Sequence, residues 1–275
     1  NRHASYEDLV ADPDIDAIYV ATPHPFHKDA SILCLEAGKA VLCEKPFTIN
    51  TAEAEAVVAV ARTKGVFLME AMWSRYLPLM AQVRQWLAED AIGEPLVVSA
   101  DFGFRANVDP EGRLFSPALG GGALLDIGIY VVSFAAMVLG AQPDRITAAA
   151  HLGETGVDEQ TGVVLGYSGG GIATLSCAVR ASTPHEARIT GSKGTIALDP
   201  SWWKGEGATL KADGHEERVE LVLEGNGYNY EAREVARCLA DGELESPVMP
   251  LDETVALMRI LDEIRAQIGL KYPME

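Results

Sequence analysis

Basic side chains are scarce in this sequence. Of its 275 residues, 22 are Lys or Arg and 40 are Asp or Glu, which gives a formal net charge of −18 at pH 7. Binding to nucleic acid requires a basic surface that releases counterions from the phosphates, and an anionic membrane surface attracts basic proteins in the same way. The composition therefore argues against nucleic acid and against a membrane surface as partners.

Long apolar runs are also missing. The first residues, 1–16, carry six charged side chains without the apolar core of a secretory signal. The longest uncharged stretch, residues 127–143, is interrupted by glycine and polar residues, whereas a membrane span needs roughly 20 apolar residues. We expect this stretch to form a buried core helix.

Cysteine is sparse, and its spacing suggests no metal site or disulfide framework. The four cysteines form no C-x-x-C pair, and among the six histidines only His24 and His27 are close in sequence. A structural metal site is therefore not expected, and no G-x-S-x-G elbow supports a hydrolase. We expect a reduced, cytoplasmic protein.

The first 70 residues alternate between strands and helices. Apolar runs at 17–21, 40–43 and 66–69 predict strands that are buried on both faces. Helices are expected between them, one from about Pro25 to Gly38 and one from a cap at Asn50 to Gly65. Short connections in this order predict a doubly wound parallel α/β sheet.

The pattern changes after residue 69. Strands follow one another around three turns, at 168–171, 191–194 and 212–214, and two helices end the chain. This pattern predicts an α+β domain with a mostly antiparallel, open sheet. We place the boundary so that residues 1–72 form the first domain and residues 73–275 the second.

Two segments carry residues that suit catalysis. Lys45 directly follows a predicted strand, so it lies at the carboxyl edge of the sheet, where α/β proteins bind ligands. The Lys45–Pro46 bond can adopt the cis form and so orient the lysine. From the segment 43–46 alone, a solvated loop lysine is the favoured interpretation.

The second segment is 120–130, with the sequence GGGALLDIGIY. Its three glycines allow a backbone to approach a ligand closely, and Asp126 and Tyr130 share one helix face. A lysine beside Tyr130 would favour the phenolate, lower the pKa of the phenol and suit it to general acid catalysis. The alternative is a core tyrosine with a satisfied hydroxyl and an aspartate bonded to backbone.

Together, residues 21–27, 44–46, 69–76 and 120–130 resemble the glucose–fructose oxidoreductase / inositol dehydrogenase (Gfo/Idh/MocA) superfamily. The resemblance runs from about residue 5 to residue 265. The motifs most resemble the branch that contains dihydrodiol dehydrogenase and NADP-dependent D-xylose dehydrogenase. A tyrosine at position 130 is typical of the dihydrodiol and glucose–fructose branch. The resemblance implies an NAD(P)-dependent oxidoreductase that transfers hydride between nicotinamide and a polyol, an aldose or a trans-dihydrodiol.

The resemblance also implies roles for individual residues. Lys45 would contact the nicotinamide ribose and the substrate hydroxyl, Tyr130 would donate or accept the proton, and Asp126 would orient substrate or catalytic groups. The implied cofactor-binding residues are Thr22, Pro23, His27, Glu44, Lys45, Pro46, Trp73 and Arg75. The implied substrate-binding residues are Trp73, Phe102, Arg113 and Tyr130. For Trp73, packing between the domains is an equal alternative, and for Tyr228 and Tyr230 packing is preferred.

One motif of the family is absent from this sequence. No G-x-G-x-x-G follows a strand and opens a helix, so the Rossmann domain is expected to lack its first strand-helix-strand unit. The sequence could omit an amino-terminal segment, represent a fragment, or belong to a catalytically silent relative that acts as a binding or assembly protein. We favour the first explanation because Lys45, Asp126 and Tyr130 are all present.

Two further expectations come from the resemblance. The cofactor is NAD or NADP, with NADP favoured by the branch. A homodimer or higher homo-oligomer is expected through the carboxyl-terminal sheet, where the runs 163–167 and 172–179 are apolar enough for an interface.

Overall fold

The first part of the chain folds as three parallel strands with helices packed on them, as the sequence predicts. The computed structural model describes residues 1–275. The strand order is β1-β2-β3, and both pairs are parallel. The elements of this part are α1 (Tyr6–Ala11), β1 (Ala17–Val20), α2 (His27–Glu36), β2 (Ala40–Glu44), α3 (Thr51–Lys64) and β3 (Leu68–Ala71).

Helix α3 shows how the local sequence sets these bounds. The Asn50 side chain accepts a hydrogen bond from the Glu53 N–H at 2.9 Å, and Gly65 ends the helix with φ +63°. The Glu53 carboxylate accepts from the N–H of Ile49 at 3.3 Å, one residue before the N–H that a capping box would use. The cap and the terminal glycine are both where the sequence predicts them.

The second part is built on an eight-stranded sheet in the order β11-β10-β9-β8-β4-β7-β6-β5. Only the β4–β7 pair is parallel, which confirms the mostly antiparallel sheet. The three predicted hairpins join β6 to β7, β8 to β9 and β10 to β11, whereas nothing in the sequence pattern pointed to α1 or β5. The strands are β4 (Pro95–Gly103), β5 (Arg145–Leu152), β6 (Asp158–Gly166), β7 (Ile172–Ala178), β8 (Ala187–Gly191), β9 (Gly194–Leu198), β10 (Gly207–Ala212) and β11 (His215–Glu220).

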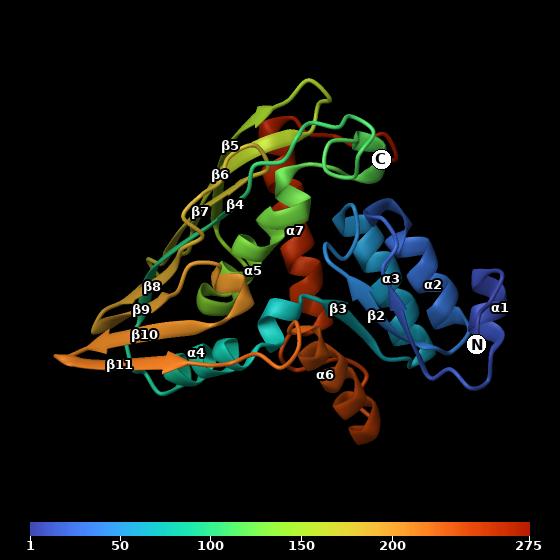
Figure 1. Ribbon diagram of the computed structural model, residues 1–275, viewed down its shortest axis with the longest axis horizontal. Helices are drawn as coiled ribbons and strands as arrows, with labels where there is room; N and C mark the ends of the chain where they lie inside the picture. The colour runs from blue at the N-terminus through green and yellow to red at the C-terminus, as the bar shows by residue number, and fades with distance from the viewer.

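Two helices lie between the sheets (Figure 1). Helix α5 (Ile129–Leu139) packs on β4 and β7, while α7 (Leu251–Ile268) contacts β5 on one side and α3 and β3 on the other. One apolar core therefore runs through both parts of the molecule. The short helix α4 (Pro78–Ala88) connects the two sheets along the chain.

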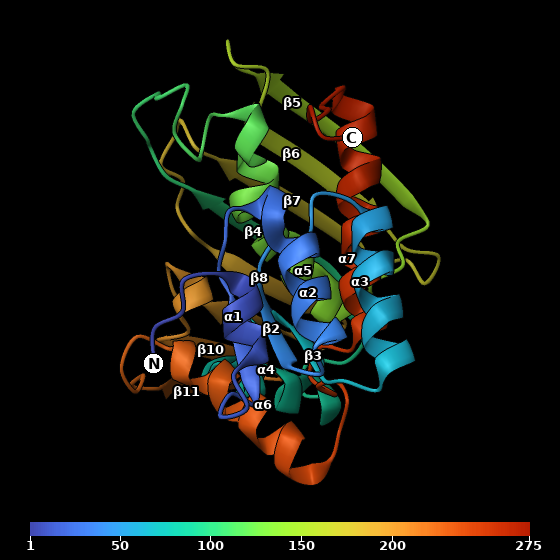
Figure 2. The same ribbon diagram turned by 90° about the vertical axis from the view of Figure 1, so that its right-hand side faces the viewer.

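Both faces of the smaller sheet are covered. Helices α1, α2 and α3 lie together on the side that faces the viewer in Figure 2. Helix α6 (Tyr228–Asp241) returns from the far end of the sequence, and its Val235 and Cys238 pack against Leu42 and Met69. The proposed division after residue 72 therefore follows chain order, while in space α6 and α7 belong to both parts.

The apolar stretch 127–143 forms a core helix, as expected, and its residues 127–136 are buried. It begins in a π turn, Leu124–Gly128, and continues as α5. The segment Pro117–Leu139 is long and apolar enough to cross a membrane by composition, but 83% of its most apolar window is buried inside the protein. Its contacts are those of a core helix.

Candidate active site

The two segments singled out from the sequence meet at the carboxyl edge of the smaller sheet. Lys45 follows β2, and its ammonium donates to the backbone oxygen of Asp126 at 2.6 Å and lies 3.4 Å from the Asp126 carboxylate. The same nitrogen lies 4.8 Å from the centre of the Tyr130 ring. Residues 81 positions apart are thus brought into direct contact.

Two histidines tie the neighbouring loops together. The His27 ring bonds the backbone oxygens of Pro46 and Thr22 at 3.0 and 2.8 Å, which joins the ends of β1 and β2. The His24 ring bonds the backbone oxygen of Gly120 at 3.1 Å. Burial lowers the pKa of His24 to about 3, so this ring is neutral. The Lys45–Pro46 bond is cis, as the sequence allows.

The glycines before the helix allow close approach to other parts of the protein. A Cβ at Gly120 would lie 2.7 Å from Ile49, and a Cβ at Gly122 would lie 2.2 Å from Asp158 Oδ1. Both glycines also have positive φ, +69° and +119°, a conformation that L side chains rarely adopt.

Asp158 holds the start of the π turn and was not identified from the sequence. Its Oδ2 accepts from the Leu124 N–H at 2.8 Å and from the Thr161 hydroxyl at 2.6 Å. Its Oδ1 is buried without a hydrogen-bond partner, and burial raises the pKa of Asp158 to about 7. Because Leu124 opens the turn that carries Asp126, the aspartate on β6 fixes where that turn begins.

Asp126 is ionised although it is buried. Burial favours the neutral acid, but the charge of Lys45 and the hydrogen bond from Arg113 at 2.6 Å together lower its pKa to about 2. The Arg113 side chain is half exposed and covers the carboxylate from the solvent side. Asp126 and Tyr130 share one face, as predicted, and Asp126 holds the ammonium of Lys45 beside the phenol.

Tyr130 departs from the expectation in one respect. Burial raises its pKa above the ordinary value, so the predicted lowering by a nearby lysine is wrong. Its oxygen accepts a hydrogen bond from the Trp73 indole N–H at 2.7 Å. Tyr130 is therefore a neutral phenol whose own proton is not used in a bond to the protein.

Aromatic rings surround this phenol. Trp73 stacks on Tyr228 with 4.9 Å between ring centres, so Tyr228 does reach the site. Phe102, from β4, lies edge-on to Tyr130 at 5.5 Å and stacks on Trp203 at 3.5 Å. Trp203 was not identified from the sequence, and its only signal there was the Trp202–Trp203 pair. Trp73 is buried and packs against Tyr130 and Tyr228, and its contact with nicotinamide or substrate stays a prediction.

Arg75 lies away from this cluster. Its guanidinium is buried and donates to the Ser133 hydroxyl at 2.9 Å and to the Glu253 carboxylate at 2.5 Å. These bonds tie the segment after β3 to α5 and α7. The structure does not support the cofactor contact expected of Arg75.

The remaining predicted residues line the carboxyl ends of β1 and β2. The Tyr19 hydroxyl donates to the Glu44 carboxylate, whose other oxygen accepts from the Lys45 N–H at 3.1 Å. The Thr22 hydroxyl is buried and has no partner in the protein. Pro23 follows it directly and precedes the turn that opens α2.

Comparison with known proteins agrees with this geometry. Residues 2–72 match a family model described as an oxidoreductase family with an NAD-binding Rossmann fold. Residues 80–197 match the model of the GFO/IDH/MocA C-terminal domain. The chain belongs to the GFO/IDH/MocA oxidoreductase family. It is an NAD(P)-dependent oxidoreductase, and the finding favours an enzyme over a catalytically silent relative.

Individual proteins of this family are similar to the chain over most of its length. Trans-1,2-dihydrobenzene-1,2-diol dehydrogenase of Mus musculus is 42% identical over 99% of this chain and 83% of its own length. The Homo sapiens enzyme of the same name is 41% identical over the same shares. Among solved structures, the aldose-aldose oxidoreductase of Caulobacter crescentus superposes with a TM-score of 0.87 at 25% identity, over 96% of this chain and 80% of that one. A 3-ketoreductase of Actinomadura kijaniata with NADP and TDP-benzene gives 0.84 at 27% identity, over 96% and 82%.

The residues at the edge of β1 and β2 fit the nicotinamide–ribose end of such a cofactor. The unpartnered Thr22 hydroxyl, the Glu44 carboxylate and the Lys45 ammonium are the kinds of group that bond ribose hydroxyls. The 275 residues contain no G-x-G-x-x-G motif for the pyrophosphate. The fit therefore concerns the nicotinamide and its ribose.

Proposed function

We propose that this protein interconverts a secondary alcohol and a carbonyl group on a polyhydroxylated substrate, an aldose or a trans-dihydrodiol, and that Lys45 and Tyr130 act on the reacting oxygen. The observation that carries the proposal is the meeting of a partly buried ammonium and a neutral phenol with a free proton beside the cofactor-binding edge. The dihydrodiol dehydrogenases and sugar oxidoreductases among its relatives support this substrate class.

Bound NAD(P) supplies the hydride donor or acceptor at the substrate carbon. Tyr130 donates its proton to the oxygen that becomes an alcohol during reduction. The Trp73 N–H points at the Tyr130 oxygen and stabilises the phenolate that remains. In the oxidative direction Tyr130 must first lose its proton, so we expect oxidation to speed up as the pH rises.

Lys45 stabilises the negative charge that develops on the substrate oxygen. A lysine ammonium has three N–H groups, and Lys45 directs bonds toward the backbone and side-chain oxygens of Asp126. This leaves donor capacity for a substrate oxygen. Asp126 therefore acts by fixing the ammonium, and Arg113 would border the substrate from the solvent side.

The test combines binding and turnover. We expect NADPH or NADH to change its fluorescence saturably when titrated with the purified protein, with NADPH preferred. We also expect reduction of the oxidised nucleotide by trans-1,2-dihydrobenzene-1,2-diol or by an aldose. A folded protein that binds neither nucleotide and oxidises neither substrate would refute the proposal.

The proposal extends to assembly and location. The uncovered face of the large sheet presents Val97, Val164 and Ile172 as exposed apolar side chains, which supports a homodimer through this face. All four cysteines are buried free thiols, in keeping with a cytoplasmic protein. A monomeric mass by sedimentation, at micromolar concentration, would refute the dimer.

A further inference from the structure

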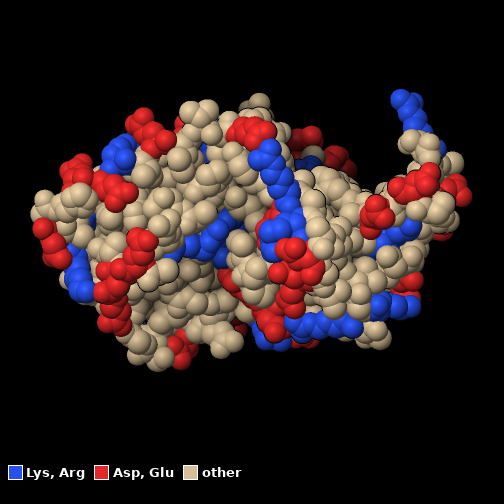
Figure 3. Space-filling view, turned by 90° about the horizontal axis from the view of Figure 1, so that it is seen from below, with Lys and Arg blue, Asp and Glu red and all other residues tan.

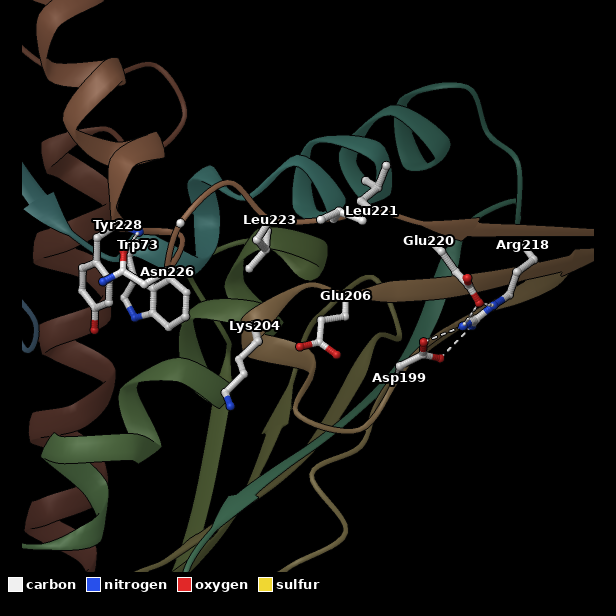
Figure 4. Close-up of a pocket in the computed structure, with 12 residues that line it drawn as sticks. Trp73, Asp199, Lys204, Glu206, Arg218, Glu220, Leu221, Leu223, Asn226 and Tyr228 are labelled. Carbon is white, nitrogen blue, oxygen red and sulfur yellow. Dashed lines mark hydrogen bonds and ion pairs between the residues drawn. The ribbon is translucent and has the colours of Figure 1, made fainter.

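A cavity of about 850 Å³ lies beside the candidate active site. Trp73 and Tyr228 stand at one end of it, and residues of β11, of the segment after β11 and of the segment between β9 and β10 form the rest of its wall (Figure 4). Its volume is within the range of small-molecule sites in proteins. None of the roles proposed above uses this space.

The cavity is continuous with the catalytic residues through one side chain. Trp73 lines the cavity, while its indole N–H bonds the Tyr130 oxygen at 2.7 Å. Its ring stacks on Tyr228 at an interplanar angle of 16°, and the outer side of this aromatic pair closes the cavity at this end. Aromatic faces carry partial negative charge and pack well against the C–H faces of sugar rings.

The charged groups of the cavity are not arranged for an anion. Arg218 is bound by Asp199 at 2.6 Å and by Glu220 at 3.0 Å, so its charge is already compensated (Figure 4). Lys204 and Glu206 make no side-chain hydrogen bond or ion pair, and in Figure 4 both extend into the space between the aromatic pair and Arg218. With three carboxylates and two cations, the lining does not attract a phosphorylated ligand.

Charges of both signs are also mixed on the wider surface of the protein. Figure 3, which shows the molecule from below, has acidic and basic side chains mixed over the whole face. Figure 3 shows no continuous basic area on this face. Hydroxyl groups, which both donate and accept hydrogen bonds, suit a free lysine and a free glutamate better than an anion does.

We propose that this cavity binds a second, uncharged sugar ring, so that the enzyme acts on disaccharides or glycosides whose reacting ring lies at Tyr130. The aromatic pair Trp73–Tyr228 stacks on the second ring, Lys204 donates to its hydroxyls and Glu206 accepts from them. This inference rests on the proposed function of the Tyr130 site.

The experiment compares disaccharides with their monosaccharides. Steady-state kcat/KM is measured for the pairs xylobiose and D-xylose, and cellobiose and D-glucose, with NADP as co-substrate. The variant combines Lys204→Met with Glu206→Gln, which keeps the shape of both side chains. The matched control is Lys211→Met, because Lys211 lies on β10 outside the cavity and pairs with Glu216.

For at least one pair, we expect the disaccharide to have the higher kcat/KM in the native enzyme. In the double variant the ratio of disaccharide to monosaccharide should fall about tenfold, the effect of removing hydrogen bonds to charged groups. The control should leave the ratio unchanged.

Three results would overturn the inference. The first is a native preference for both monosaccharides with no change of the ratio in the double variant, which leaves the proposed function intact. The second is a preference for a nucleoside-diphosphate sugar over both disaccharides. The third is the absence of turnover with every sugar and with the dihydrodiol, which would refute the proposed function as well.

Discussion

Asp126 and Asp158 are two buried aspartates at the same π turn, and their surroundings differ. Asp126 lies inside the turn, within reach of two cations, and despite burial its pKa is lowered to about 2 by Lys45 and Arg113. Asp158 lies at the start of the turn, accepts hydrogen bonds only from neutral groups, and has its pKa raised to about 7 by burial. Because both side chains are buried, the two cations beside Asp126 account for the difference between the two pKa values.

The two aspartates differ in what they require from their surroundings. A charge kept inside a protein is costly unless it is paired, so the ionised Asp126 requires Lys45 at a fixed place. A neutral carboxyl group can instead hold backbone and hydroxyl groups without a partner of opposite charge. The charged end of the turn therefore faces the reaction, while the neutral end positions it.

Within this comparison of the two ends of the turn, the largest effect is expected from Lys45→Met. The substitution removes the group that stabilises the substrate oxygen and leaves Asp126 with Arg113 as its only cation. Turnover should fall by about 10²-fold or more, as when an oxyanion-stabilising donor is removed. The measurement is kcat at saturating nucleotide, with Lys64→Met on the surface of α3 as the control. Native-like kcat in a folded Lys45→Met protein would show that the lysine has no such role.

Two substitutions of Asp158 test whether the start of the π turn needs an acceptor oxygen or a charge. Asp158→Ala leaves the Leu124 N–H and the Thr161 hydroxyl without their acceptor, which should cost about 1–3 kcal/mol of unfolding free energy and lower kcat several-fold. Asp158→Asn keeps an acceptor oxygen, so this variant should retain most of the unfolding free energy and most of kcat. The measurements are chemical denaturation and kcat for each variant. Equal losses in the two variants would mean that the charge of Asp158, rather than its acceptor oxygen, is required.

The smallest expected effect comes from Glu70, on β3, and it concerns how the stability of the fold changes with pH. Its carboxyl group is buried without a hydrogen-bond partner, and burial raises its pKa to about 7 from 4.5. The folded protein therefore holds a proton that the unfolded chain releases above pH 4.5, so this group makes the fold less stable as the pH rises from 4.5 to 7.

Glu70→Gln should remove that loss, because glutamine stays neutral at every pH. Between pH 5 and pH 8 the melting temperature of the variant should fall a few degrees less than that of the native protein. The control is Glu7→Gln on the exposed surface of α1. If the native protein and Glu70→Gln lose the same number of degrees, Glu70 is ionised in the fold.

Local signals in the sequence were enough for much of the fold. Asn50 and Gly65 define α3 because capping and left-handed termination depend on neighbouring residues alone. The start of β3 was predicted two residues too early, because the Val66 N–H still donates to Ala61 and so belongs to the end of α3. Such a bond is invisible in a run of apolar residues.

The candidate site was predicted only where a motif marks it. Lys45 and Tyr130 were found because each lies in a short pattern with a resemblance to known enzymes. Asp158 contacts a residue 34 positions away, and Arg75 pairs with Glu253 across 178 positions, so neither role leaves a local signal. The direction of the Tyr130 pKa shift was wrong because burial, which depends on the whole fold, outweighs the lysine charge.

The most direct test of the account is Tyr130→Phe, which removes only the hydroxyl that receives the Trp73 hydrogen bond. Initial rates of NADP reduction with trans-1,2-dihydrobenzene-1,2-diol are measured beside those of the native protein, with melting temperatures to confirm the fold. Proton transfer by a positioned side chain contributes about 10²–10⁴-fold, so the variant should lose that much of kcat. A folded Tyr130→Phe protein that keeps the native rate would contradict the account.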